Sequence, residues 1–118
     1  MLRIYVYDGC STCRSALKWL DGRGIRYTAV PIRERPPTPS ELRRMLAHAG
    51  GQVKSLFNRS GKDYREQGLA TRLPEMSDAQ ALALLAANGD LVKRPFALDE
   101  DEGAVGFDAE RWTTLFAH

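Results

Sequence analysis

The chain has 118 residues and a formal net charge of +2, which is the size of one globular domain. This weak charge excludes the strongly basic composition with which proteins bind nucleic acid directly, and no apolar run reaches the roughly 20 residues that a membrane-spanning helix needs. Residues 1–6 lead directly into a strand pattern and lack the apolar core of a signal peptide. We therefore expect a cytoplasmic protein, and we expect it to be a monomer.

A strand–helix–strand unit opens the chain. Residues 2–7 are β-branched and aromatic, which predicts a buried strand that Asp8-Gly9 ends. Apolar residues at helical spacing predict a helix over 11–20, with Gly22 and Gly24 after it, and residues 25–32 predict a second strand. Two strands joined by one helix of this length form a right-handed βαβ unit.

Helices and turns are expected in the middle of the chain. Residues 33–39 are polar and proline-rich, which is typical of a crossing loop, and Ser40 is placed to cap the helix that follows. Further helical segments are predicted at 53–57, at 64–69 and from Ser77-Asp78 to Asn88, separated by a turn at 58–62 and a break at Leu73-Pro74.

The last third returns to strands. Residues 91–98 and 104–107 predict two strands around an acidic turn at 99–103, and Asp108 is placed to cap a final helix. Pro95 lies inside the first of these strands, where a proline requires an edge, a bulge or a special bend. The order βαβ, helices, ββα indicates a single α/β domain of thioredoxin-like fold.

The chain has two cysteines, Cys10 and Cys13, three positions apart. Cys10 falls between the first strand and the first helix, where unpaired amides and the helix dipole favour a thiolate. A thiolate is the nucleophile in disulfide exchange and in attack on oxyanions. Cys13 follows one helical turn later on the same face, and Arg14 adds positive charge. The spacing predicts that Cys10 attacks and that Cys13 resolves.

Two other interpretations of this pair are open. Both cysteines can be small buried residues without reactivity. They can also supply two zinc ligands, although only His48 and His118 remain as histidines and neither has finger-like spacing. We expect no metal.

The chain resembles the ArsC family, the arsenate reductase-like branch of the thioredoxin superfamily, which includes the Spx/MgsR group. The resemblance runs through essentially the whole chain in order. It is carried by Cys10-Ser11-Thr12-Cys13-Arg14, Leu56-Phe57-Asn58-Arg59-Ser60-Gly61, Tyr64-Arg65-Glu66-Gln67-Gly68-Leu69, Leu91-Val92-Lys93-Arg94-Pro95 and Val105-Gly106-Phe107.

The resemblance implies a four-stranded mixed sheet, with one domain over 1–118 and a helical insertion at about 38–90. It implies a cis Pro95 beside the cysteine loop and an Arg94 that points towards Cys10, stabilises the thiolate and binds an anion or a glutathione carboxylate. The expected catalytic residues are Cys10, Cys13 and Arg94. The expected substrate-binding residues are Ser11, Thr12, Arg14, Asn58, Arg59 and Pro95.

Three functions are compatible with the resemblance. The first is a thiol–disulfide oxidoreductase or thiol-dependent reductase with a redox-active disulfide. It acts on a disulfide or small oxyanion, binds no cofactor and takes electrons from glutathione or a thioredoxin- or glutaredoxin-type protein. The second is an Spx-like redox-sensing regulator that contacts RNA polymerase, a contact at which that group has a glycine matching Gly51.

The third function is a glutathione-dependent arsenate reductase. Such enzymes resemble this chain but hold the oxyanion with three arginines. Arg94 matches one of them, whereas Asn58, with Arg59 beside it, and Gly106 stand at the other two positions. Two missing cations predict weak arsenate binding.

Overall fold

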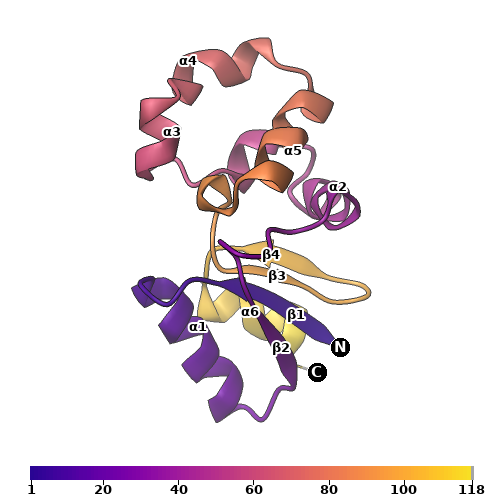
Figure 1. Cartoon of the computed structure of the whole chain (residues 1–118). Helices are drawn as coiled ribbons and strands as arrows, with labels where there is room; N and C mark the ends of the chain where they lie inside the picture. Colours follow the sequence, from indigo (N-terminus) through magenta and orange to yellow (C-terminus); the bar gives the residue numbers. More distant parts are fainter. Residues whose placement is uncertain (118) are drawn as a thin grey trace.

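The computed structural model of the chain describes residues 1–117 and contains a mixed sheet of four strands (Figure 1). The strand order is β2-β1-β3-β4. Strand β1 (Leu2–Val6) pairs in parallel with β2 (Tyr27–Pro31) and antiparallel with β3 (Phe96–Leu98), which pairs antiparallel with β4 (Gly103–Val105). The predicted α/β, thioredoxin-like fold with a mixed four-stranded sheet is confirmed.

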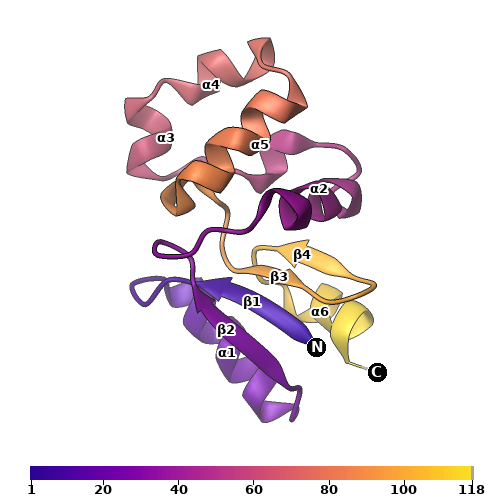
Figure 2. The ribbon, with the colours of Figure 1, turned by 45° about the vertical axis from the view of Figure 1, so that its right-hand side comes forward.

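Helices cover both faces of this sheet. Helices α1 (Ser11–Gly22) and α6 (Ala109–Phe116) lie on one face, and α2 (Pro39–His48) and α5 (Asp78–Ala87) lie on the other (Figure 2). The remaining short helices are η1 (Val53–Leu56), α3 (Lys62–Glu66), α4 (Leu69–Arg72), η2 (Leu73–Glu75) and η3 (Gly89–Leu91), the η elements being 3₁₀ helices. Within residues 1–117 no helix has the length and apolar character to cross a membrane.

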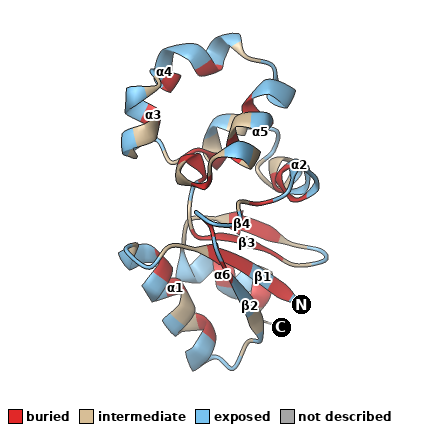
Figure 3. Ribbon diagram, viewed as in Figure 1, coloured by how far each residue is buried: buried red, intermediate tan, exposed pale blue. Residues whose placement is uncertain are grey.

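The central strand β1 is buried on both faces because successive side chains of a strand point to opposite sides. Ile4 packs with Ala16 of α1 and Trp112 of α6. Tyr5 points to the other side and joins the cluster that contains Leu42 of α2. Figure 3 shows the burial of strand β1 between the two layers of helices. Burial on both faces explains why residues 4–7 are all apolar or aromatic, whereas Arg3 is exposed.

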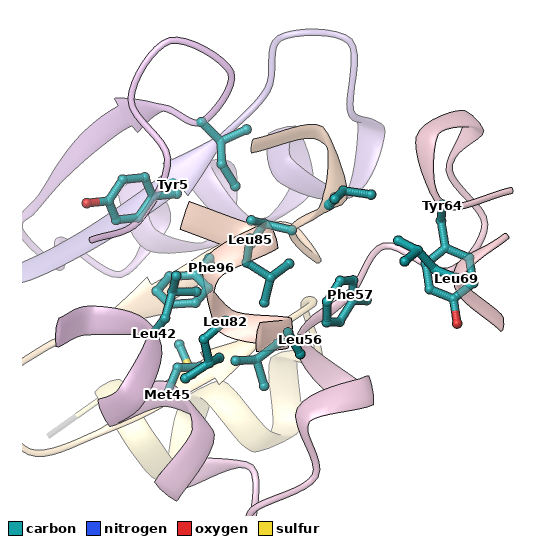
Figure 4. Packing of buried hydrophobic residues seen from close by; sticks show 14 of the residues in the cluster. Tyr5, Leu42, Met45, Leu56, Phe57, Tyr64, Leu69, Leu82, Leu85 and Phe96 are labelled. Carbon is teal, nitrogen blue, oxygen red and sulfur yellow. The ribbon is translucent and has the colours of Figure 1, made fainter. Parts of the chain in front are cut away.

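The larger core cluster joins the sheet to the helices between β2 and β3. Figure 4 shows Phe96 of β3 together with Leu42 and Met45 of α2 and Leu82 and Leu85 of α5. The same cluster continues through η1 into the short helices, where it includes Leu56, Phe57, Tyr64 and Leu69.

Backbone hydrogen bonds also tie these helices to the approach to β3. Phe57 and Val92 form an isolated antiparallel bridge. The Lys93 N–H donates to the Leu56 carbonyl at 2.8 Å, and the Asn58 N–H donates to the Leu91 carbonyl at 2.7 Å. The backbone just before Arg94 is therefore paired with residues 56–58.

The expected cap of helix α2 was wrong. The helix begins at Pro39 with Thr38 as its N-cap, and Ser40 lies inside the first turn. The Thr38 hydroxyl accepts from the Glu41 N–H at 3.2 Å, while the Glu41 carboxylate accepts from the Thr38 N–H at 3.0 Å. This reciprocal capping box, together with a proline at the first helical position, outweighs a serine two positions later.

Three strand or break boundaries also differ from expectation. The strand expected over 91–98 spans only Phe96–Leu98, because residues before it form η3 and pair with Phe57. The strand expected over 104–107 is β4, which ends before Gly106 with its φ of +73°. Leu73-Pro74 begins the 3₁₀ helix η2 instead of breaking the chain, since a proline is tolerated in a first helical turn.

Candidate functional site

Cys10 lies at the start of helix α1, as its position in the sequence predicts. It has extended backbone angles and is the N-cap residue, and its Sγ accepts from the Cys13 N–H at 3.2 Å. The Cys10 N–H donates to the Tyr7 carbonyl at 3.0 Å, which fixes the turn after β1. The sulfur is half-buried and faces the unpaired amides of the helix N-terminus. This position leaves the Cys10 sulfur within reach of a reaction partner.

Cys13 has the opposite environment. Its side chain is buried, with 1% exposure, beneath the first turn of α1. Burial, and after it a hydrogen bond to Cys10, raises the pKa of the Cys13 thiol to about 12. The positive charge of Arg94 acts in the other direction and lowers this pKa. Both cysteines are free, and at neutral pH Cys13 is a thiol.

The loop that carries Cys10 packs on an aromatic ring. A Cβ built on Gly9 would lie 2.6 Å from Cε2 of Tyr7, closer than side chains tolerate. Glycine at this position therefore lets the ring of Tyr7 lie directly under the turn. Tyr7 supports the shape of the cysteine loop.

Arg94 lies in the segment just before strand β3. The Arg94–Pro95 peptide is cis, as the resemblance implies. The Arg94 guanidinium lies 5.2 Å from the ring centroid of Tyr7, and its Nη1 is 3.8 Å from Oδ1 of Asp90. This Nη1 is buried and has no hydrogen-bond partner within residues 1–117. A buried donor without a partner is a group that a bound anion would satisfy.

A second arginine holds this arrangement. Arg33 stacks on the same ring at 4.3 Å from its centroid, and its Nε donates to Oδ1 of Asp90 at 2.6 Å. Its Nη1 also donates to the Tyr7 hydroxyl at 3.1 Å. Asp90 and Tyr7 thus link Arg33 and Arg94 in one cluster under the cysteine loop. No sequence motif predicts a role for Asp90 or Arg33 at this site.

An open pocket of about 300 Å³ lies beside the cysteine loop. Two of its lining residues, Thr12 and Arg94, are among the expected site residues. Lys93 and Arg111 also line the pocket, although the sequence did not predict a role for them. The only sequence signals for such a role are that Lys93 is next to Arg94 and that Arg111 is one turn after the cap Asp108. The full lining is Thr12, Lys93, Arg94, Val105, Gly106, Phe107, Asp108, Arg111 and Trp112.

Other expected substrate-binding residues do not line this pocket. Asn58 is held in its own turn, where its Oδ1 accepts from the Ser60 hydroxyl at 3.4 Å, and the neighbouring Arg59 is exposed. Arg14 donates to the Asp8 carbonyl at 2.7 Å and so braces the loop. Ser11 is exposed at the first position of α1, and Pro95 is buried beside Arg94.

Comparison with known proteins places this site in a family. The ArsC family model matches residues 5–115. The uncharacterized protein YusI of Bacillus subtilis is 40% identical over 98% of both chains. An arsenate reductase of Rhizobium meliloti is 33% identical over 80% of this chain and 66% of its own length.

Structural and regulatory relatives give the same family. The crystal structure of an ArsC family-related protein from Bacteroides fragilis has a TM-score of 0.89 and 42% identity, and the match covers 96% of this chain and 97% of that one. A protein of Streptococcus agalactiae named global transcriptional regulator Spx is 24% identical over 93% of this chain and 79% of its own. With a family model matched from residue 5 to residue 115, the chain belongs to the ArsC family.

Proposed function

We propose that this protein is a thiol–disulfide oxidoreductase in which Cys10 attacks, Cys13 resolves and Arg94 stabilises negative charge. The observation that carries the proposal is the contrast between the two thiols. Cys10 caps helix α1 and is partly exposed, whereas Cys13 is buried and its pKa is raised to about 12. One sulfur is therefore suited to meet a partner and the other to act only within the protein.

The reaction proceeds in two exchanges. The Cys10 thiolate attacks one sulfur of a substrate disulfide, forms a mixed disulfide and releases the other half as a thiolate that takes a proton from water. Cys13 then gives up its proton and attacks the Sγ of Cys10, which releases the second half of the substrate as a thiol. The two cysteines end as a disulfide, and the substrate has gained two electrons and two protons.

A mixed disulfide at Cys10 makes the second exchange easier. Burial is the largest cause of the raised pKa of Cys13, but the hydrogen bond to Cys10 and the charge on Cys10 add to it. Both of these contributions end when Cys10 is bonded to the substrate, while the opposing charge of Arg94 remains. The pKa of Cys13 therefore falls at the step in which its thiolate is needed.

Electrons for the next cycle come from an external thiol. We propose glutathione or a thioredoxin- or glutaredoxin-type protein as the donor, which reduces the Cys10–Cys13 disulfide by the reverse exchange. The protein binds no cofactor in this cycle, because the two sulfurs carry the electrons.

A turnover assay tests the proposal. The full chain is given 2-hydroxyethyl disulfide with glutathione, glutathione reductase and NADPH, and in parallel with thioredoxin, thioredoxin reductase and NADPH. We expect turnover by the wild type, none above background for Cys10→Ser, and a Cys10 mixed disulfide detectable by mass spectrometry in Cys13→Ala. Equal rates for the wild type and Cys10→Ser with both donors would refute the proposed oxidoreductase activity.

Arg94 has its own control within this assay. Arg94→Lys keeps a positive charge but not the planar group that stacks on Tyr7, whereas Arg94→Ala loses both. We expect Arg94→Ala to react more slowly than Arg94→Lys, and both more slowly than the wild type. Unchanged rates in Arg94→Ala would remove Arg94 from the mechanism while leaving the cysteine chemistry in place.

Arsenate is an alternative substrate because a relative named arsenate reductase matches 80% of this chain. The buried Nη1 of Arg94, without a partner in residues 1–117, favours an anion at the site. Asn58 and Gly106 supply no charge at the two other positions that resemble arginine sites. Arsenate added to the same glutathione-coupled assay decides this point, and we expect a much lower kcat/KM for arsenate than for the disulfide.

A regulatory function is supported by the match to a global transcriptional regulator over 93% of this chain. In this alternative, formation of a Cys10–Cys13 disulfide would alter a surface that binds RNA polymerase. Pull-down of purified RNA polymerase by the oxidised protein, the reduced protein and Cys10→Ser tests it. Equal, background-level recovery in all three would exclude this function.

A further inference from the structure

The pocket beside the cysteine loop is built from three separate parts of the chain. Thr12, two residues after Cys10, lies at its edge. Lys93 and Arg94 come from the segment before β3, and Arg111 comes from the first turn of α6. The fold therefore gathers three cationic side chains around a pocket that Thr12 of the first turn of α1 also lines, next to the two cysteines but not lined by them.

The charge of this pocket is not neutralised from within. Its one carboxylate, Asp108, accepts from the Glu110 and Arg111 amides at 3.0 and 3.3 Å and so caps α6. Neither Lys93 nor Arg111 forms an ion pair with any residue in 1–117, and both are exposed. The buried Nη1 of Arg94, 3.8 Å from Oδ1 of Asp90, adds a donor without a hydrogen-bond partner in residues 1–117. The pocket is therefore suited to a negatively charged group.

Gly106 gives Lys93 its path to the pocket. A Cβ built on Gly106 would lie 3.3 Å from Cε of Lys93, and the glycine has a φ of +73°. A side chain at this position would be strained by the backbone and would press on the stem of Lys93. Gly106 thus leaves room for the Lys93 side chain at the pocket.

The volume of the pocket indicates the kind of anion. At about 300 Å³ the pocket is at the lower end of the range for small organic ligands, about 300–1,000 Å³, and larger than one tetrahedral oxyanion requires. We propose that Lys93 and Arg111 form a carboxylate subsite for the partner of Cys10, which is then a small thiol or disulfide that carries a carboxylate. This inference rests on the proposed thiol chemistry of Cys10.

A series of disulfides of different charge tests the subsite. The probes are 3,3′-dithiodipropionate, which is anionic, 2-hydroxyethyl disulfide, which is neutral, and cystamine, which is cationic. The rate of mixed-disulfide formation at Cys10 is measured for each in Cys13→Ala, which stops the reaction after the first exchange. We expect the anionic probe to react about tenfold faster than the neutral one, and the preference to shrink at high salt because salt screens exposed charges.

Substitutions of the two cations give the decisive comparison. In Lys93→Ala and in Arg111→Ala, made in the same background, we expect the anionic-to-neutral rate ratio to fall about threefold each, as is usual for one exposed charge. The charge-retaining variants Lys93→Arg and Arg111→Lys should keep the ratio. Lys18→Ala, an exposed lysine on α1 away from the pocket lining, is the matched control and should also keep it.

The outcomes separate the subsite from the cysteine chemistry. Two results would overturn the subsite: an anionic-to-neutral rate ratio near one at Cys10, or a ratio that neither alanine variant changes. Both results would leave the proposed oxidoreductase activity intact. If Cys10 does not react at all, the oxidoreductase fails, and a titration of Cys10→Ser with 3-mercaptopropionate followed by NMR still tests the subsite. Shifts of the Gly106 and Arg111 amides that are lost in Lys93→Ala support it, and their absence refutes it.

Discussion

At the scale of single residues, the same helix turn gives the two cysteines different chemistry. Cys10 is the cap and is reachable, whereas Cys13 is one turn on and buried under α1. The difference comes from burial more than from the helix dipole, because burial is the largest cause of the raised pKa of Cys13. We therefore expect the pair to react in a fixed order, with the outer sulfur first.

This order has a pH signature. After a mixed disulfide forms at Cys10, we expect the pKa of Cys13 to stay above its ordinary value of 9.0, because burial is the largest cause of its rise. The thiolate fraction, and with it the rate of the second exchange, should rise about tenfold per pH unit from pH 7 to 9. Single-turnover reaction with the disulfide 5,5′-dithiobis(2-nitrobenzoate) measures this step as the second release of yellow thiolate.

The second release should be absent in Cys13→Ala, which has no resolving sulfur. A rate that levels off below pH 8 would show that Cys13 is already a thiolate there, and it would contradict the assignment of the buried sulfur.

Gly9 offers a test of the loop itself. An alanine here places its Cβ 2.6 Å from Cε2 of Tyr7, so the ring must move, and the ring in turn carries Arg33 and Arg94. We expect Gly9→Ala to lower the free energy of unfolding by about 1–3 kcal/mol and to slow alkylation of Cys10 severalfold. Urea denaturation and iodoacetamide kinetics measure the two effects.

The neighbouring Asp8→Ala is the control for Gly9→Ala, since its exposed side chain can be removed without crowding Tyr7. Equal behaviour of the two variants would mean that the ring does not brace the loop.

What the sequence predicts at this scale depends on whether the signal is local. Cys10 and Cys13 were identified because a helix start and a one-turn spacing are visible in adjacent residues. Arg94 and the cis Pro95 were expected only from the family resemblance. Lys93, Arg111 and Asp90 were not identified, because their relation to Cys10 arises when β3, α6 and η3 meet in space. Asn58 and Arg59 were placed in the site by motif position and lie outside the pocket lining.

At the scale of elements, caps decide where the helices begin. Asp108 was predicted as a cap and acts as one, and Ser77, which was expected only to open a helix with Asp78, is the N-cap of α5. The cap of α2 was misplaced because two candidates, Thr38 and Ser40, stand two positions apart. Only the hydrogen bond from the Thr38 N–H back to the Glu41 side chain distinguishes them. The strand around Pro95 was drawn too long because the pairing partner of Val92 is Phe57, which lies far away in the sequence.

Helix α6 provides the prediction at this scale. Its cap Asp108 satisfies two amides, and the helix buries Trp112 and Phe116 against the sheet. Asp108→Ala should lower the free energy of unfolding by about 0.5–2 kcal/mol, whereas Asp108→Asn should cost little because asparagine caps helices equally well. Urea denaturation followed by tryptophan fluorescence measures both, and equal losses in the two variants would show that charge and not capping is responsible.

At the scale of the whole molecule, one buried polar contact joins the sheet to the helices that follow β2. The Tyr5 hydroxyl of β1 donates to Oε1 of Glu41 in α2 at 2.6 Å, and Arg3 lies 3.4 Å from Oε2. Tyr5 and Glu41 are 3% and 8% exposed, so the contact is shielded from water. Burial works to raise the pKa of Glu41, but hydrogen bonds from Tyr5 and Thr38 outweigh it, and the pKa is lowered.

This contact makes stability depend on pH at the alkaline end. Burial and the hydrogen bond to Glu41 raise the pKa of Tyr5 from 10.0 to about 12. A folded-state pKa above the unfolded one means that the contribution of the phenol is fully present below pH 10 and is lost as the pH rises through 12. The shift corresponds to about 2–3 kcal/mol. Tyr5→Phe cannot ionise, so the stability advantage of the wild type over this variant should be constant below pH 10 and shrink between pH 10 and 12.

Urea denaturation at steps of pH measures that difference, with Tyr27→Phe as the control. The Tyr27 hydroxyl donates to Asp21 on an exposed surface at 2.8 Å, so its removal should change the alkaline slope much less. If the wild type and Tyr5→Phe instead lose stability in parallel up to pH 12, the Tyr5 phenol does not stabilise the packing of the sheet against these helices. The joint between them would then rest on apolar contacts alone, among them the edge-to-face pair of Tyr5 and Phe96, whose ring centroids are 5.7 Å apart.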